Sequence, residues 1–265
     1  MSNEEFFLTG SKRKEKIAKV TKHAIALKNG GREAALESFE DLNSGLLDIG
    51  HSFWQVLPER TNLKDYIEGT LQERKGEVIL VEFGGIAVEL SSGFSPGFLK
   101  KSIGVVLVDH REPEQKGHSF REETGQHKIL EGDILSPKFY SGILERELRK
   151  EKVDLIIERM IGGLRFIPDD PYILTKILKI WYKLLRERGI MFVQVNSTLR
   201  NLLTKWSKLI KSEYKDKIEL EINFNSRLFS VFRLRKLSGA PIELPLLDRN
   251  TLKGIEVFDH WEHFV

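Results

Sequence analysis

Three carboxylates stand at or just beyond the ends of short apolar runs, where they could bind a ribose or a purine. Glu82 closes the first run, Asp109 closes the second, and Asp133 follows the third. An acid at the end of a second strand accepts two hydrogen bonds from a ribose diol, and one after a third strand accepts from an exocyclic amine. Gly84 and Gly85 follow Glu82 and let the backbone turn tightly against a ligand. The alternative for Asp109 is a loop-capping aspartate, and for Asp133 a simple Gly-Asp turn.

The elements that must position these residues are alternating strands and helices after Gly76. Five continuous apolar runs have the pattern of strands buried on both faces, and helical patterns separate them. Such alternation implies right-handed crossovers and a parallel, doubly wound sheet. Two further runs alternate polar and apolar residues, and only Asn225 and Ser226 separate them, which predicts an antiparallel hairpin. The expected strands are 78–82, 103–109, 127–130, 153–158, 189–195, 217–224 and 227–234.

The N-terminal part of the chain has the patterns of helices and loops. We predict helices at Ser11–Asn29 and Arg32–Leu47, and a third helix that follows Asn62 as its N-cap. We divide the chain into a helical cap at 1–75, which would cover the pocket, and a Rossmann-like unit at 76–265. The predicted fold class is α/β: a doubly wound, mostly parallel seven-stranded sheet with an antiparallel last hairpin, plus an N-terminal helical extension.

Caps and stops predict the boundaries of the later helices. The helix after the first strand should end before Gly93, and Pro171 should open a strong helix that Gly189 ends. Asn196 or Ser197 should cap the helix after the fifth strand. Its expected inward-facing residues are Leu199, Leu202, Trp206 and Leu209.

Composition limits the class of protein. The 265 residues include 42 basic and 39 acidic side chains, a net charge of +3, and no cysteine. The chain therefore has no disulfide, thiolate nucleophile or Cys-ligated metal, which is compatible with a reducing cytoplasm. No apolar run approaches the roughly 20 residues of a membrane helix, and the N-terminus lacks a secretory pattern. We expect a soluble, cytoplasmic protein without a membrane partner, and a charge balance that does not require nucleic acid.

Taken together, these residues resemble the class I S-adenosylmethionine-dependent methyltransferases over about residues 76–236. In that family an acid and a glycine-rich turn end the first strand, as VEFGG does at 81–85, and acids follow the second and third strands. The family also closes its sheet with an antiparallel hairpin. The resemblance implies S-adenosylmethionine as the cofactor, with the glycine pair along its methionine part. The implied cofactor-binding residues are Glu82, Gly84 and Gly85, with Asp109 at the ribose, and Asp133 and Ile134 at the adenine. His110 follows Asp109 and could reach the rim of the pocket, and its alternative is an exposed histidine.

The chain departs from that family in the turn, where the second and third expected glycines are Ile86 and Val88. At these positions the backbone of the turn would come close to the ligand, so bulky side chains either move the loop or block the ligand. They motivate a rival interpretation, a catalytically inactive methyltransferase-like protein that serves as a binding or scaffold module. A nicotinamide-dependent oxidoreductase would need the full G-x-G-x-x-G turn. RNA modification would use the basic stretch at 198–236.

Glu158 and Arg159 lie at the exit of the fourth strand, where members of that family commonly contact substrate. Glu158 could orient or deprotonate an amine or hydroxyl, and its alternative role is an ion pair with a nearby arginine. Arg159 is the candidate substrate-binding residue. Methyl transfer depends mainly on alignment, so we expect no catalytic triad. His260 and His263 lack a third ligand, so we expect no metal. The predicted function is methyl transfer to a small molecule.

Overall fold

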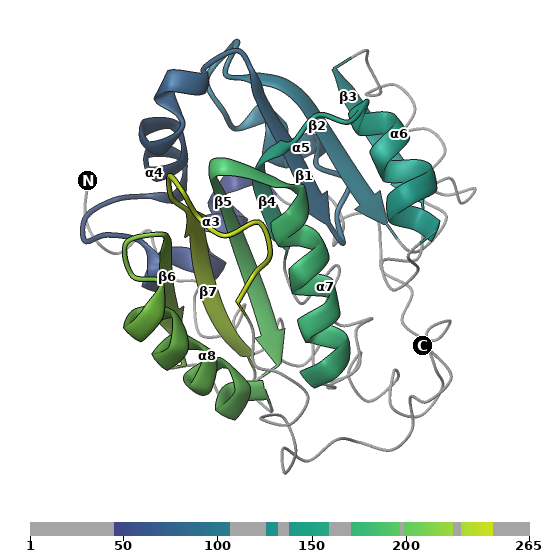
Figure 1. Cartoon of the computed structure of the whole chain (residues 1–265). Coiled ribbons are helices and arrows are strands. Elements are labelled where there is room, and N and C mark those ends of the chain that lie inside the picture. The colour runs from purple at the N-terminus through teal and green to yellow at the C-terminus, as the bar shows by residue number, and fades with distance from the viewer. Residues whose placement is uncertain are drawn as a thin grey trace, which may run out of the picture.

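The protein folds around one seven-stranded sheet. The structure, a computed structural model, describes residues 45–106, 126–131, 138–158, 171–196, 199–224 and 229–245. The strand order is β3-β2-β1-β4-β5-β7-β6 (Figure 1). The strands are β1 Val78–Phe83, β2 Leu99–Val106, β3 His127–Glu131, β4 Val153–Glu158, β5 Leu185–Asn196, β6 Ile218–Asn223 and β7 Phe229–Lys236.

The strand directions confirm the predicted fold class. β1 pairs with β2 and β4 in parallel, and the β2–β3 and β4–β5 pairs are parallel too. β7 is antiparallel to both β5 and β6, as the predicted hairpin requires. The order reverses at β1, whose neighbours are β2 on one side and β4 on the other. The crevice beyond the carboxyl ends of β1 and β4 is therefore the expected ligand site of this sheet.

Six α-helices cover the sheet in the part of the chain that the structure describes. They are α3 Leu46–Phe53, α4 Leu63–Thr70, α5 Val88–Ser92, α6 Glu145–Leu148, α7 Pro171–Leu184 and α8 Arg200–Glu213. The predicted N-cap of α4 is confirmed, because the Asn62 side chain accepts a hydrogen bond from the N–H of Asp65 at 2.8 Å. The predicted end of α5 before Gly93 and the predicted start of α7 at Pro171 are also confirmed.

The predicted helix stop at Gly189 is wrong. α7 ends at Leu184, and Gly189 lies inside β5. A Cβ on Gly189 would stand 3.0 Å from the backbone oxygen of Asp154 and 2.9 Å from that of Arg186. The glycine is therefore explained by close contacts within β5, at Leu185 and Arg186, and with β4 at Asp154. A helix-stop pattern does not reveal these contacts.

Other details of the helix predictions also differ. The helix predicted to end at Leu47 does not continue into α3, because Gly45 is extended and α3 begins after it, at Leu46. The predicted cap of α8 at Asn196 or Ser197 is wrong, because α8 begins at Arg200 and Asn196 ends β5. Leu209, expected to face inward, is only half-buried. The fully buried positions of α8 are Leu202, Leu203, Trp206 and Ile210.

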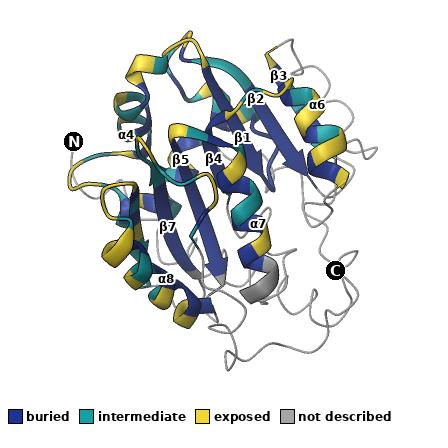
Figure 2. Ribbon diagram, in the orientation of Figure 1, coloured by how far each residue is buried: buried dark blue, intermediate teal, exposed yellow. Residues whose placement is uncertain are grey.

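Side chains leave the sheet alternately on its two faces, and each face has its own core. Figure 2 shows the strands buried along most of their length, with the exposed positions mainly on helices and loops. We call one the α7 face, because residues of α6, α7 and α8 pack there against Val81 and Phe83. We call the other the α4 face, because residues of α3, α4 and α5 pack there against Leu80 and Ile157. Both faces are covered, which explains why the strands β1 and β4 are buried at every position and mostly apolar.

The described part of the predicted helical cap packs on the sheet itself. Ile49 and Phe53 of α3 and Ile67 of α4 share the core of the α4 face with Phe192 of β5. The division at residue 75 stays a prediction, and the predicted helix at Ser11–Asn29 lies outside the described residues. None of the described helices combines the length and apolar character that a membrane span needs.

Candidate active site

The turn between β1 and α5 wraps around the carboxylate of Glu82. Only 2% of this residue is exposed, and its Oε2 accepts a hydrogen bond from the backbone N–H of Ala87 at 2.7 Å. Gly84 has a φ of +84°, a conformation that favours glycine, and its N–H donates to the Val105 oxygen at 2.7 Å. A Cβ on Gly85 would stand 2.5 Å from Glu82 Oε2. Both glycines are thus required by the way the turn closes on Glu82.

Ile86 is accommodated on the face of the sheet. Its side chain is fully buried in a small cluster with Val106 at the end of β2 and Ile129 of β3. Val88 is half-buried and packs against the same cluster. Ile129 pairs with Gly104 in the sheet register, so the cluster lies on the α4 face. The two bulky residues of the turn are therefore taken up by packing on β2 and β3.

Glu158 ends β4 and is fully buried, and its Oε2 accepts a hydrogen bond from the Gln194 N–H at 3.3 Å. In the register of β1 and β4, Phe83 pairs with Glu158 and Glu82 pairs with Ile157. Neighbouring positions of a strand point to opposite faces. The two acids Glu82 and Glu158 therefore lie on adjacent strands, but the side chain of Glu82 is on the α4 face and that of Glu158 is on the α7 face.

The structure brings Glu82, Gly84 and Gly85 together at the carboxyl end of β1. The other candidate site residues lie outside the described residues, and their roles stay predictions. They are Asp109, His110, Asp133, Ile134 and Arg159.

A buried polar pair next to this turn was not predicted. Ser102 Oγ of β2 lies 2.7 Å from His127 Nδ1 of β3, and both residues are buried. The two positions pair in the register, two residues before Gly104 and Ile129, which places them on the α4 face. The only signal in the sequence is that each polar residue adjoins an apolar run.

Asp154 organises the opposite, amino end of β4. It is 1% exposed, and its Oδ2 accepts a hydrogen bond from the Ile79 N–H at 3.0 Å. Its Oδ1 lies 3.0 Å from Arg186 Nε and 3.4 Å from Arg74 Nε. Burial raises the pKa of Asp154, although the hydrogen bond and both arginines act to lower it. An acid inside the apolar run VDLIIE was the signal for this structural ion-pair centre.

The fold is the one that the methyltransferase resemblance predicts, with its acid and its glycine turn at the end of β1. Two features of the described part of the turn bear on the approach of a ligand. The carboxylate of Glu82 holds the turn closed, and Ile86 is buried against Val106 and Ile129 on the sheet face.

Comparisons with known proteins give likeness of fold alone. No family model matches the chain, and no curated protein matches its sequence. Similar solved structures include an rRNA methylase from Streptococcus thermophilus, 11% identical with a TM-score of 0.42, over 69% of this chain and 100% of that one. Another is the MycE methyltransferase of the mycinamycin biosynthetic pathway with Mg and SAH, which is 13% identical with a TM-score of 0.46. The match covers 85% of this chain and 64% of that one. A third is the N-methyltransferase NodS from Bradyrhizobium japonicum WM9, 14% identical with a TM-score of 0.38, over 66% and 96%.

Proposed function

We propose that this chain is a class I S-adenosylmethionine-dependent methyltransferase that acts on a small molecule. The observation that carries the proposal is the closed turn after β1, in which Glu82 accepts a hydrogen bond from the Ala87 N–H. This turn lies at the carboxyl edge of the sheet, beside the point where the strand order reverses. Ligands of doubly wound sheets bind at that place. The proposal includes a cytoplasmic location, with which a chain without cysteine is compatible.

Each candidate residue has a proposed role. Glu82, Gly84 and Gly85 would hold the methionine end of the cofactor, and the remaining cofactor-binding residues would be Asp109, His110, Asp133 and Ile134. When bound, the cofactor supplies a methyl group on a positively charged sulfur. Glu158, at the end of β4, would orient the acceptor amine or hydroxyl and take up its proton, and Arg159 would bind the substrate. Burial of Glu158 excludes water from that carboxylate.

Calorimetry with S-adenosylhomocysteine on the full chain tests this proposal. We expect saturable binding, and Asp109→Ala should weaken it by about 1–3 kcal/mol if this residue holds the ribose diol. Asp48→Ala is the matched control, because Asp48 is exposed on α3. No heat at millimolar ligand would exclude cofactor binding, and an unchanged affinity of the Asp109 variant would exclude its ribose role.

A second candidate is the catalytically inactive binding or scaffold protein. One observation favours it: the space beside Gly85 is filled by the carboxylate of Glu82, and the space over Gly104 by the backbone of Ile86. The glycines of this region are thus accounted for by the protein's own packing. The same calorimetry separates the two candidates, because a scaffold of this kind would bind neither S-adenosylmethionine nor its demethylated product.

A further inference from the structure

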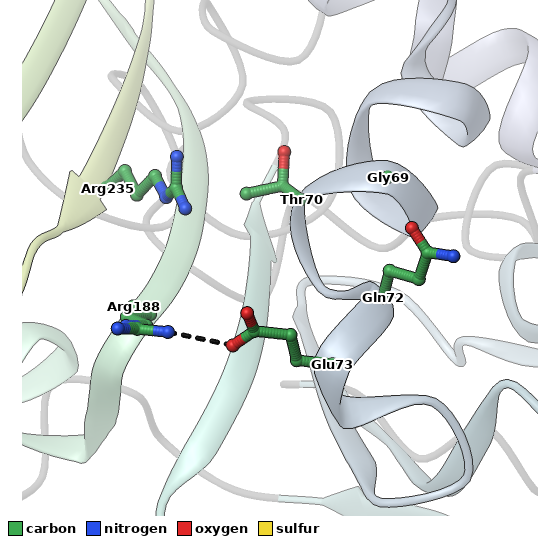
Figure 3. A pocket seen from close by; sticks show the side chains of 6 residues that line it. All are labelled: Gly69, Thr70, Gln72, Glu73, Arg188 and Arg235. Carbon is green, nitrogen blue, oxygen red and sulfur yellow. Dashed lines mark hydrogen bonds and ion pairs between the residues drawn. The ribbon is translucent and has the colours of Figure 1, made fainter.

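A cleft lies at the edge of the sheet opposite the turn after β1. Its volume is about 510 Å³. One wall comes from the amino half of β5 and the adjoining end of β7, where Ile190 pairs with Arg235, and the other from the end of α4 and the turn after it. The lining residues are Gly69, Thr70, Gln72, Glu73, Arg188 and Arg235 (Figure 3). Glu82 and Glu158 end their strands at the other edge, so this cleft is separate from the proposed cofactor site.

Arg235 lines this cleft and is held by one distant carboxylate among the described residues. Its Nε is buried and has no hydrogen-bond partner among the described residues. The nearest carboxylate oxygen, Oε2 of Glu219, is 3.9 Å from Nη1 of Arg235. Glu219 is already engaged by Arg233, which is buried behind Arg235 on β7 with its guanidinium 4.6 Å from the ring centre of Tyr66. An arginine that lines a cleft and has only a distant carboxylate partner is suited to an anionic ligand.

Arg188 faces the same cleft but is held only by an exposed partner. Its Nη1 lies 2.7 Å from Glu73 Oε2, and the two side chains are 59% and 81% exposed. Ion pairs of this kind contribute little and exchange readily. Figure 3 shows Arg188 and Glu73 meeting across the cleft, with Arg235 on the same wall as Arg188. A ligand that is more anionic than one carboxylate can therefore displace Glu73 from Arg188.

The remaining lining favours a phosphate. Gly69 contributes no side chain, and no atom lies within 4 Å of the position that its Cβ would take. Thr70 also lines the cleft, and its hydroxyl is already hydrogen-bonded to Tyr66. A phosphate has three terminal oxygens and carries more negative charge than a carboxylate, so it can accept hydrogen bonds from two guanidinium groups at once. We propose that this cleft binds the phosphate group of a small phosphorylated molecule between Arg188 and Arg235.

The test is calorimetry on the full chain at low ionic strength, with inorganic phosphate and glycerol 3-phosphate as the probes. We expect saturable binding of glycerol 3-phosphate, weakened about tenfold or more by Arg188→Gln and by Arg235→Lys. The lysine keeps the charge of Arg235 and removes its planar fork. Arg188 is exposed, so its variant keeps the test valid if the Arg235 variant does not fold. Glu73→Gln should tighten binding about threefold, because it frees Arg188 and removes a competing charge.

Arg146→Gln is the matched control, because Arg146 is exposed on α6, which packs on the α7 face. It should leave the affinity unchanged. Absence of saturable binding of both probes would overturn the proposal. Equal loss in all three arginine variants would also overturn it, since the attraction would then be diffuse. A short single-stranded RNA that binds while glycerol 3-phosphate does not would overturn it in favour of a nucleic-acid surface.

Discussion

The backbone of Ile86 lies directly over Gly104 of β2, where a Cβ would stand 2.5 Å from the Ile86 Cα. The turn after β1 carries isoleucine where the resembling family has its second glycine, and the small residue lies instead in the strand beneath it. This relationship lets the turn approach the sheet closely while Ile86 packs against Val106 and Ile129. The conformation of the turn therefore depends on β2. A substitution that adds a side chain at Gly104, or that removes the side chain of Ile86, should disturb both segments.

Gly104→Ala should destabilise the protein, because the new methyl group overlaps backbone atoms that cannot move independently. We expect a loss of about 2–3 kcal/mol in the free energy of unfolding, measured by denaturant titration. Gly142→Ala is the matched control, since nothing lies within 4 Å of its Cβ position and the residue belongs to the helical turn Phe139–Leu144. The control should be neutral or slightly stabilising. Equal losses in both variants would contradict the close contact between Gly104 and Ile86.

Ile86→Ala should cost about 2–4 kcal/mol of stability, because it removes a fully buried side chain. Val88→Ala is the control, and it should cost less because Val88 is only half-buried. The affinity for S-adenosylhomocysteine should stay the same in Ile86→Ala if the side chain lies only on the sheet face. A gain in affinity, measured by calorimetry at a temperature where the variant is folded, would instead show that Ile86 obstructs the cofactor.

Glu82 and Gly85 should be strongly coupled. Gly85→Ala places a methyl group 2.5 Å from Glu82 Oε2, so it should destabilise the native protein by about 2–3 kcal/mol. Glu82→Ala removes the obstacle but leaves the buried Ala87 N–H without that acceptor, at a cost of about 1–3 kcal/mol.

A double-mutant cycle of unfolding free energies measures this coupling. In the Glu82→Ala background, Gly85→Ala should cost at least about 1 kcal/mol less than in the native chain. Additive effects would mean that the carboxylate does not occupy the space beside Gly85.

Glu68 should make stability depend on acid pH. Burial alone would raise its pKa, but hydrogen bonds from the Ser95 N–H at 2.6 Å, Lys64 at 2.9 Å and the Ser95 hydroxyl at 2.9 Å outweigh it, and the pKa is lowered. The folded state therefore favours the ionised form. Its contribution is present above the ordinary pKa of a glutamate and is lost as the pH falls through the lowered value.

Glu68→Gln should accordingly reduce the free energy of unfolding by about 1–2 kcal/mol at neutral pH, and the difference from the native chain should shrink on acidification. Denaturant titrations across the acid range measure it. Glu59→Gln is the control, because Glu59 is exposed in the loop before α4. A difference that is constant over the whole pH range would show that the carboxylate charge is not the source of the effect.

Local patterns were enough to predict most of the elements. The run VDLIIE gave the bounds of β4 without error, because a strand buried on both faces is mostly apolar. Asn62 and Pro171 marked the starts of α4 and α7, because their chemistry suits helix N-termini. Gly189 was misinterpreted, because a glycine required by close contacts inside a strand and with its neighbour has the same sequence signal as a helix stop.

The sequence by itself determined the alternation of strands and helices, the antiparallel last hairpin, and the acid and glycines at the end of β1. These follow from hydrophobic periodicity and backbone preferences, which are properties of short segments. Only the tertiary structure decided that Glu82 and Glu158 leave opposite faces of the sheet, that Gly104 makes room for Ile86, and that Arg188 meets Glu73 in a cleft. Each of these depends on strand register or on segments far apart in the chain, and such relationships are fixed only when the whole sheet packs.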